Sequence, residues 1–196
     1  TTIRNRIHPT FTPNLALISQ SSQVSFEDTA QIAAAIQKQL TRDFAPIWNI
    51  QATISAYASL EHVPVGYWNI VIRDDIGDPR AAGYHQDEFG QPYALVDADM
   101  EVPIVCSHEA LEMMVDPFGD RHVASDSIVE SQGRVLYLVE VCDPSEAGEF
   151  GYDANGIRLS DFYTPSYFDP VVSAGVQYSF TGAIQRPKEV LRDRKS

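Results

Sequence analysis

Hydrophobic residues recur with helical spacing between Ser25 and about Phe44, and this pattern predicts the first helix of the chain. Ser25 is the expected N-cap, because Asp28 follows it at the spacing of a capping box. The pair Ala45-Pro46 is expected to end this helix, since proline disfavours helical backbone in the residue before it. The pattern therefore predicts one long amphipathic helix near the N-terminus.

Strand-like patterns surround this helix. Residues 1–22 predict an extended arm with one short strand around residues 16–18. After the helix, residues 50–57 alternate between apolar and polar side chains, and residues 67–72 predict a more buried central strand. Two further segments predict a hairpin, with strands at 81–85 and 93–97 joined across residues 87–90.

A second helix is predicted from about Ile104 to Asp116, and it is apolar on most of its surface. Such a helix is expected to be buried, and Pro117 is expected to stop it. The chain beyond it has weaker patterns. We expect a loop at 118–134, a strand or short buried helix at 135–142, a turn at 153–156 between short strands, an irregular aromatic segment at 160–170 and a frayed charged tail at 186–196.

The composition suits a globular protein and argues against some partners. The chain has 196 residues, of which 44% are hydrophobic, and this is enough for a real core. The formal net charge of −13 argues against binding a nucleic-acid backbone. No apolar run approaches the roughly 20 residues of a membrane span, and the first residues contain no signal-peptide core. We therefore expect a soluble protein that binds neither nucleic acid nor membrane, while its oligomeric state stays open.

The second helix carries the sequence His108-Glu109-x-x-Glu112. Residues four apart lie on one helical face, so His108 and Glu112 could bind the same metal ion. In zinc hydrolases with a His-Glu-x-x-His helix, the Glu acts as general base, and Glu109 stands in that place here. The pattern alone is weak, because glutamates on helices usually form a solvated face. The apolar surroundings strengthen it, since buried charge needs a partner or a metal.

A catalytic zinc site needs a third protein ligand. Asp116 lies two turns from His108, roughly 12 Å along the axis, so it is expected to cap or brace instead. Glu140 is our first choice for the third ligand and Asp143 the second, although both could be surface or capping groups. Cys106 and Cys142 each neighbour a candidate ligand. They could form a bridge, supply a thiolate near the metal, or remain two buried thiols.

Three sequence motifs resemble those of a group of uncharacterised bacterial and phage zincin-like proteins. They are Ser107-His108-Glu109-Ala110-Leu111-Glu112-Met113-Met114-Val115-Asp116-Pro117, Glu140-Val141-Cys142-Asp143, and Ser160-Asp161-Phe162-Tyr163-Thr164-Pro165-Ser166-Tyr167-Phe168. The segment 41–48 also resembles this group, and the likeness spans roughly residues 25–170. The plant Exordium-like proteins share a looser His-Glu-x-x-Glu-x-x-x-Asp-Pro pattern.

The resemblance implies an α+β, zincin-like fold and a bound metal, but no particular substrate. The order of helix, strands, hairpin and His-Glu helix is that of the N-terminal lobe of zincin metallopeptidases. We therefore expect a single zincin-like domain over residues 1–196, with an N-terminal lobe at 1–117 that contains the active helix and a smaller irregular lobe at 118–196. Glu112 departs from true zincins, which have a second histidine in that place.

Other residues could contact a substrate. His85 lies on the predicted hairpin that would border the cleft, where it could bind substrate or metal, or be an ordinary surface histidine. Tyr163 and Tyr167 could donate to an oxyanion, or they could simply pack as core aromatics. We assign nothing to the remaining histidines, which are His8, His62 and His122.

These observations lead to the hypothesis of a zinc-dependent hydrolase, with a peptide or protein as substrate and Glu109 as general base. A ligand set rich in carboxylates could favour manganese or calcium over zinc. One rival is a non-catalytic, metal-stabilised binding or virion-associated module on a zincin-like scaffold. The other rival is a metal-free protein whose helix carboxylates form a buried hydrogen-bonded cluster.

Overall fold

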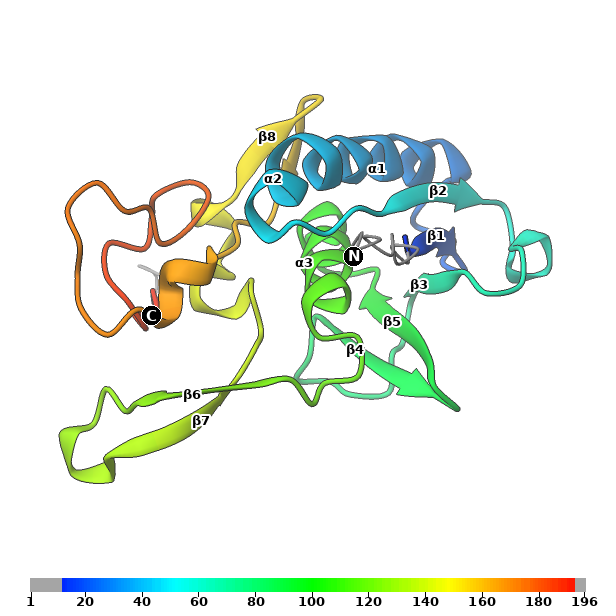
Figure 1. Ribbon diagram of the computed structural model, residues 1–196. Coiled ribbons are helices and arrows are strands. Elements are labelled where there is room, and N and C mark those ends of the chain that lie inside the picture. Colours follow the sequence, from blue (N-terminus) through cyan, green and yellow to red (C-terminus); the bar gives the residue numbers. More distant parts are fainter. Residues whose placement is uncertain (1–11, 193–196) are drawn as a thin grey trace, which may run out of the picture.

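A mixed five-stranded sheet forms the framework of the protein in the computed structural model, which describes residues 12–192 (Figure 1). The strand order is β2-β1-β3-β5-β4, in which β4 runs antiparallel to β5 and the other pairs are parallel. This arrangement places β4 at one edge. The strands are β1 (Asn14–Ser19), β2 (Thr53–Tyr57), β3 (Trp68–Arg73), β4 (Gly83–Glu88) and β5 (Gln91–Asp97).

Both long helices, α1 (Phe26–Lys38) and α3 (Val102–Val115), pack on the same face of the sheet. Successive strand residues point to opposite faces, so every second residue contributes to this core. The strand residues on the helix-covered face include Leu15, Leu17, Ile70, Ile72, Ala94 and Val96. The residues between them form a smaller cluster with tyrosine side chains on the other face. His85 pairs with Ala94, so it points toward the helices.

The first helix starts as predicted, but the predicted end at Ala45-Pro46 is wrong. Ser25 accepts from the backbone N–H of Asp28, and the Asp28 side chain accepts from Ser25 in return, which confirms the capping box. After α1 the chain continues through a π-helical turn, Gln39–Phe44, and a short helix α2, Ala45–Trp48. Pro46 is tolerated because it opens this last turn, where a helix does not need its missing N–H.

The predicted strands of the sheet are confirmed, with shifted ends. The hairpin of β4 and β5 turns at Phe89-Gly90, both with positive φ. The short strand expected near residues 16–18 is longer and more central than predicted, because β1 pairs with both β2 and β3 and its inner residues are fully buried. Residues 1–11 of the expected N-terminal arm lie outside the described residues.

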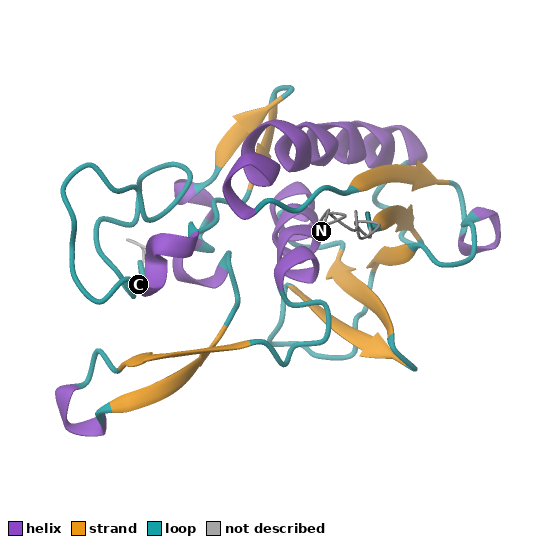
Figure 2. Ribbon diagram, in the orientation of Figure 1, coloured by secondary structure: helices purple, strands orange, loops and turns teal. Residues whose placement is uncertain are grey.

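The C-terminal part contains two small antiparallel sheets, β6–β7 and β8–β9 (Figure 2). The turn at Asn155-Gly156 between β8 and β9 confirms one prediction. The loop expected at 118–134 is wrong in part, because β6 forms there by pairing with β7. Of the two alternatives expected at 135–142, the strand is confirmed for its first part as β7, whose residues alternate between exposed and half-buried, and the buried helix is wrong. The bounds are β6 (His122–Asp126), β7 (Arg134–Leu138), β8 (Tyr152–Ala154) and β9 (Ile157–Leu159).

The architecture is thus α+β, with the helices α1 and α3 packed on a mixed sheet and two small sheets toward the C-terminus. The core that contains α1, α3 and the sheet also includes later residues such as Phe162, Tyr178 and Ile184. The expected division into two lobes of one domain stays a prediction. Among the described residues, no helix is both long and apolar enough to cross a membrane. The last four residues of the predicted tail lie outside the described part.

Candidate metal centre

Helix α3 brings His108 and Glu112 together as its spacing predicts. The Nε2 atom of His108 lies 3.2 Å from Oε2 of Glu112, one helical turn away. Apolar residues cover most of the helix, so both Glu109 and Glu112 are carried into the protein interior. Burial of two carboxylates on adjacent turns is costly unless they are paired with cations or hydrogen-bond donors. The arrangement of the surrounding groups therefore decides what the site can do.

The segment after β7 supplies further polar groups to this site. The backbone N–H of Cys142 donates to Oε1 of Glu112 at 3.1 Å, and Oδ1 of Asp143 lies 3.3 Å from Nε2 of His108. Glu140 is half-buried, and its carboxylate interacts with that of Glu112. Both candidates for a third ligand therefore lie beside the His108–Glu112 pair. Asp143 lies close to His108, whereas Glu140 interacts electrostatically with Glu112.

The motifs that carried the resemblance meet in space. The Ser107 hydroxyl accepts a hydrogen bond from the backbone N–H of Ser160 at 2.8 Å, which fixes α3 against the Ser160–Phe168 segment. The indole N–H of Trp48 donates to the carbonyl of Tyr163 at 3.0 Å. Phe162 packs against Phe44 with ring centroids 5.2 Å apart. The segments 41–48 and 160–168 therefore pack against each other, and the second of them is hydrogen-bonded to α3 beside the site.

His85 reaches the same site from the edge strand β4. Its Nε2 lies 2.9 Å from the carbonyl oxygen of Asp116, so this nitrogen must carry the proton and donate. Its Nδ1 lies 3.4 Å from Oε2 of Glu109 and 3.7 Å from Oε2 of Glu112. The side chain is only 6% exposed. His85 is thus an interior residue of the site, and the alternative of an ordinary surface histidine is wrong.

The carboxylates and imidazoles shift one another's protonation. Burial opposes charge on His85, but Glu109, Glu112 and Glu140 raise its pKa to about 9. Burial likewise opposes charge on His108, yet the same carboxylates and Asp143 hold its pKa well above the usual range. Each imidazole therefore tends to be protonated and positively charged beside the carboxylates. A metal ion could supply this positive charge in place of the proton.

The pKa values of the three glutamates in the site are shifted in opposite directions. Burial raises the pKa of Glu109, and burial together with the charge of Glu112 raises that of Glu140 to about 8. Burial alone would raise the pKa of Glu112 as well, but His108 and His85 reverse that effect and lower it. Glu112 is therefore the carboxylate most strongly held in its charged form, at the centre of the site.

Both cysteines are buried and free, so the bridge between Cys106 and Cys142 is absent. The Cys142 thiol points to the carbonyl of His108, with the sulfur 3.8 Å from the oxygen. Burial, then the charge of Glu112, raises the pKa of this thiol well above its usual value. Cys142 therefore stands beside the two helix residues as a neutral thiol, and a cation would be needed to favour its thiolate.

Asp116 braces the end of the helix, as expected. Its carboxylate oxygens accept from the backbone N–H groups of Asp120 and Arg121, both at 3.0 Å. Its carbonyl also orients His85.

The two candidate tyrosines differ in their hydrogen bonds. The Tyr167 hydroxyl donates to the carbonyl of Glu189, whereas the buried Tyr163 hydroxyl has no hydrogen-bond partner among the described residues. Their roles in substrate binding stay predictions.

A pocket of about 230 Å³ opens above His108 and Glu109. The pattern of the sequence did not single out three of its lining residues, namely Arg80, Gly83 and Glu146. Arg80 and Glu146 lie in loops without a recognisable motif, so only the fold reveals them. Gly83 opens β4 next to α3. The pocket gives a small molecule or a peptide side chain access to the histidine and glutamate of the helix.

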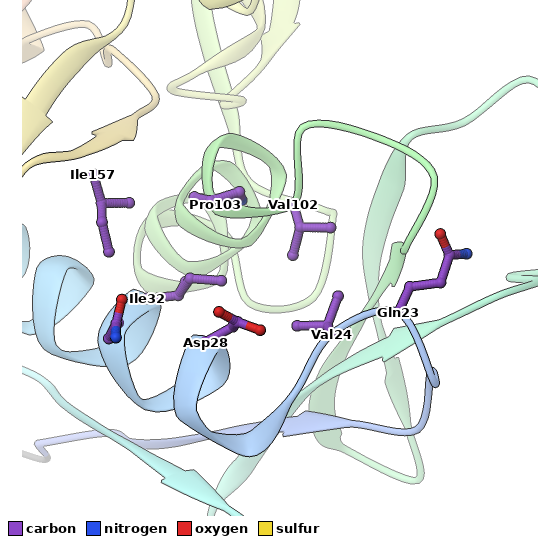
Figure 3. Close-up of a pocket in the computed structure, with 8 residues that line it drawn as sticks. Gln23, Val24, Asp28, Ile32, Val102, Pro103 and Ile157 are labelled. Atoms are coloured by element: carbon purple, nitrogen blue, oxygen red, sulfur yellow. The ribbon is translucent and has the colours of Figure 1, made fainter.

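A different pocket, of about 320 Å³, lies between the beginnings of α1 and α3 (Figure 3). Its lining combines apolar and polar side chains, and Asp28 is the titratable residue within it. Asp28 is already engaged in capping α1. We therefore assign no chemistry to this pocket.

Three histidines have no role expected from the sequence. His62 and His122 are exposed, and His8 lies outside the described residues.

Two sets of donor atoms in the described chain are close enough together to hold a metal ion. One set is His108, Glu112 and Cys142, and the other is His85, Glu109 and Glu112. No protein-family model, curated protein or solved structure matches this chain. The assignment of a function therefore rests on the chemistry of these side chains.

Gly83 is required for the close approach of β4 to α3, and this leads to a first prediction. A Cβ atom at this position would lie 2.5 Å from Cγ1 of Val105 and 2.9 Å from Oε1 of Glu109. We expect Gly83→Ala to lower the free energy of unfolding by about 1–3 kcal/mol, the cost of overpacking a dense interior. Urea unfolding measures this change.

The double variant Gly83→Ala/Val105→Ala provides the control, because it removes the nearest clashing atom. The alanine at 83 should cost less in the Val105→Ala background than in the wild type. An equal cost in both backgrounds would show that contact with Val105 is not the cause.

Proposed function

We propose that this chain is a zinc-dependent hydrolase of the peptidase class. In this proposal His108 and Glu112 bind the ion, a third donor comes from the segment Glu140–Asp143, and Glu109 is the general base. The observation that carries it is that donor atoms of His108, Glu112 and Cys142 lie close enough together to hold an ion, beside a pocket that His108 and Glu109 border.

The distances between His108 and its two neighbouring carboxylates are compatible with ligands of a metal ion. A tetrahedral ion with bonds of about 2.0–2.1 Å places its ligand atoms about 3.3–3.4 Å apart. The nitrogen of His108 lies 3.2 Å from Glu112 and 3.3 Å from Asp143. Hydrogen bonds between charged groups are shorter, about 2.7–2.9 Å. The spacing of His108 from each oxygen is therefore that of two ligands on one ion, and the set around His108 and Glu112 that could hold an ion is completed by Cys142.

Orphaned oxygens support a cation as well. Oε2 of Glu109 and Oε2 of Glu140 are buried and accept no hydrogen bond from the described residues. Buried polar atoms of this kind are rare in stable proteins and usually have an explanation such as an ion. Cys142 could replace Asp143 or Glu140 as third donor, since its sulfur belongs to the set with His108 and Glu112. Zinc accepts nitrogen, oxygen and sulfur ligands, which suits all three choices.

A bound zinc ion would polarise the scissile carbonyl and make a nearby water a stronger nucleophile. Glu109 would take the proton of this water and pass it to the leaving amine. Burial raises the pKa of Glu109, which makes its carboxylate a better proton acceptor than an exposed glutamate. Arg80 lines the pocket and could orient the substrate there.

The arrangement of elements supports a zincin-like scaffold. The helix, strands and edge hairpin precede the His-Glu helix in the order that the resemblance implies. A non-catalytic metal-stabilised module is the second candidate. It is favoured by one observation, the approach of Glu109 to His85, which could keep this carboxylate from a substrate. The pocket bordered by Glu109 favours the hydrolase.

Metal content tests the proposal directly. We expect apo-protein that has been offered zinc, then dialysed against zinc-free buffer, to retain close to one ion per chain. Glu112→Gln should lose most of this ion, because a ligand carboxylate is replaced by a weakly binding amide. Plasma emission spectrometry measures both.

The matched control is Glu130→Gln, which makes the same chemical change at an exposed position on the β6–β7 connection. It should retain the ion. A wild type without stoichiometric metal, or a Glu112→Gln variant that binds as the wild type does, would contradict the proposed centre.

A further inference from the structure

Glu112 is shared by two separate sets of metal-binding atoms. On one side its carboxylate faces His108, and on the other side it faces His85 and Glu109. The oxygen Oε2 is the closest atom in both directions, 3.2 Å from His108 and 3.7 Å from His85. The proposed function uses only the His108 side. The His85 side is a built arrangement of donors that this function does not explain.

The orientation of His85 leaves one nitrogen free for a cation. Its Nε2 is committed as a donor to the carbonyl of Asp116. A backbone carbonyl that holds one ring nitrogen in this way is the usual support for a metal-binding histidine. In the neutral imidazole, the lone pair of Nδ1 then points at the carboxylates of Glu109 and Glu112. Three electron-rich atoms that face one another need a positive charge between them, which a proton on Nδ1 supplies in the metal-free protein and which a metal ion can supply in its place.

The distances and the burial indicate what kind of charge fits. Nδ1 of His85 lies 3.4 Å from Glu109, longer than a hydrogen bond between charged groups and close to the ligand spacing of a tetrahedral ion. Oε2 of Glu109, which faces His85, is buried and has no hydrogen-bond partner among the described residues. This unpartnered buried oxygen is independent of the clustering of acidic residues, and it points to an ion.

We propose that His85, Glu109 and Glu112 form a second site for a divalent transition-metal ion, with Glu112 as the bridge to the first. One nitrogen and two carboxylates suit zinc or manganese. The second ion is expected to bind more weakly, because it must share Glu112 with the first.

The second site has a consequence for catalysis, and this part rests on the proposed function. A Glu109 carboxylate that binds an ion cannot accept a proton from water. Occupation of the second site therefore inhibits hydrolysis, so the rate rises with the first equivalent of metal and falls with the second. The protein would work within a window of metal concentration.

Metal titration of apo-protein tests the second site without any need for activity. We expect equilibrium dialysis against rising zinc to give two ions per chain for the wild type and one for His85→Ala. His62→Ala, at an exposed histidine, is the matched control and should still bind two. His85→Gln is the second variant, since its amide can keep the hydrogen bond to Asp116 if the alanine variant fails to fold.

Manganese provides an independent readout of the bridge. Two Mn²⁺ ions that share one carboxylate are magnetically coupled, so the electron paramagnetic resonance spectrum of the wild type should show an exchange-coupled pair. The spectrum of His85→Ala should show a single uncoupled ion. Two ions without coupling would overturn the role of Glu112 as a bridge.

The remaining outcomes separate this inference from the proposed function. If the wild type binds one ion and His85→Ala still binds it, the second site is overturned and the first is intact. If the wild type binds one ion that is lost in His85→Ala but kept in His108→Ala, the proposed ligand set and the shared centre are overturned. If the wild type binds no ion, both sites are overturned. If two ions bind but excess zinc does not lower the rate of an active wild type, the inhibitory consequence is wrong.

Discussion

Glu109→Gln is expected to lower kcat for peptide hydrolysis at least about a hundredfold, the scale of general-base catalysis. The metal content and the fold should remain those of the wild type. The glutamine has the size of the glutamate, and in the proposed mechanism Glu109 touches the attacking water rather than the first metal ion. An amide cannot accept the proton of that water, so the rate falls although the site stays assembled.

This result would differ in kind from that of Glu112→Gln. Glu112 has one oxygen held by the backbone N–H of Cys142 and the other directed at both histidines. Its replacement should release the metal, and activity would be lost for that reason. A base and a ligand on adjacent turns of α3 can thus be told apart by measuring rate and metal content on the same samples.

The assay is digestion of a broad peptide library, read by mass spectrometry at one equivalent of zinc. Glu130→Gln is the control for a glutamate-to-glutamine change, because Glu130 is exposed on the connection between β6 and β7. Undiminished cleavage by Glu109→Gln would show that Glu109 is not the base. A fully metallated wild type that cleaves nothing in the library would favour the non-catalytic module.

Local patterns were sufficient for much of this fold. The capping box at Ser25, the helix that carries His108 and the β4–β5 hairpin are each determined by residues close together in sequence. Features that depend on a distant partner were harder to predict. Strand β6 has little hydrophobic pattern of its own and forms because β7 pairs with it. The helix continues past Pro46 because this proline occupies one of the first positions of the short helix α2, where its missing N–H is tolerated.

The same difference between local patterns and distant contacts explains which residues of the candidate site could be predicted from the sequence. His108 and Glu112 could be paired from the helical repeat alone. The position of His85 could not, because it depends on the register of β4 against β5 and on the packing of α3 over that edge of the sheet. The contact of Cys142 with Glu112 depends on how the chain returns after the β6–β7 ribbon. Such contacts, between residues 24 and 30 positions apart for His85–Glu109 and Cys142–Glu112, follow from tertiary structure.

Chelation is expected to lower the melting temperature of the metal-loaded protein by roughly 8–16 °C. A ligand that binds only the folded state stabilises it by about 4 kcal/mol when its free concentration is a thousand times its Kd. For a chain of this size, each kcal/mol moves Tm by roughly 2–4 °C. The donors come from α3, β4 and the segment after β7, so the metal would join parts of the chain that are distant in sequence.

His108→Ala should abolish most of this chelator effect, because it removes the imidazole of the first site. The variant should therefore melt at nearly the same temperature with and without chelator, as differential scanning calorimetry would record. His62→Ala, the exposed control, should retain the full shift. A wild type whose melting is unchanged by chelator would argue against metal as a stabilising element. An equally large shift in His108→Ala would place the stabilising ion elsewhere, with the His85 set as the next site to examine.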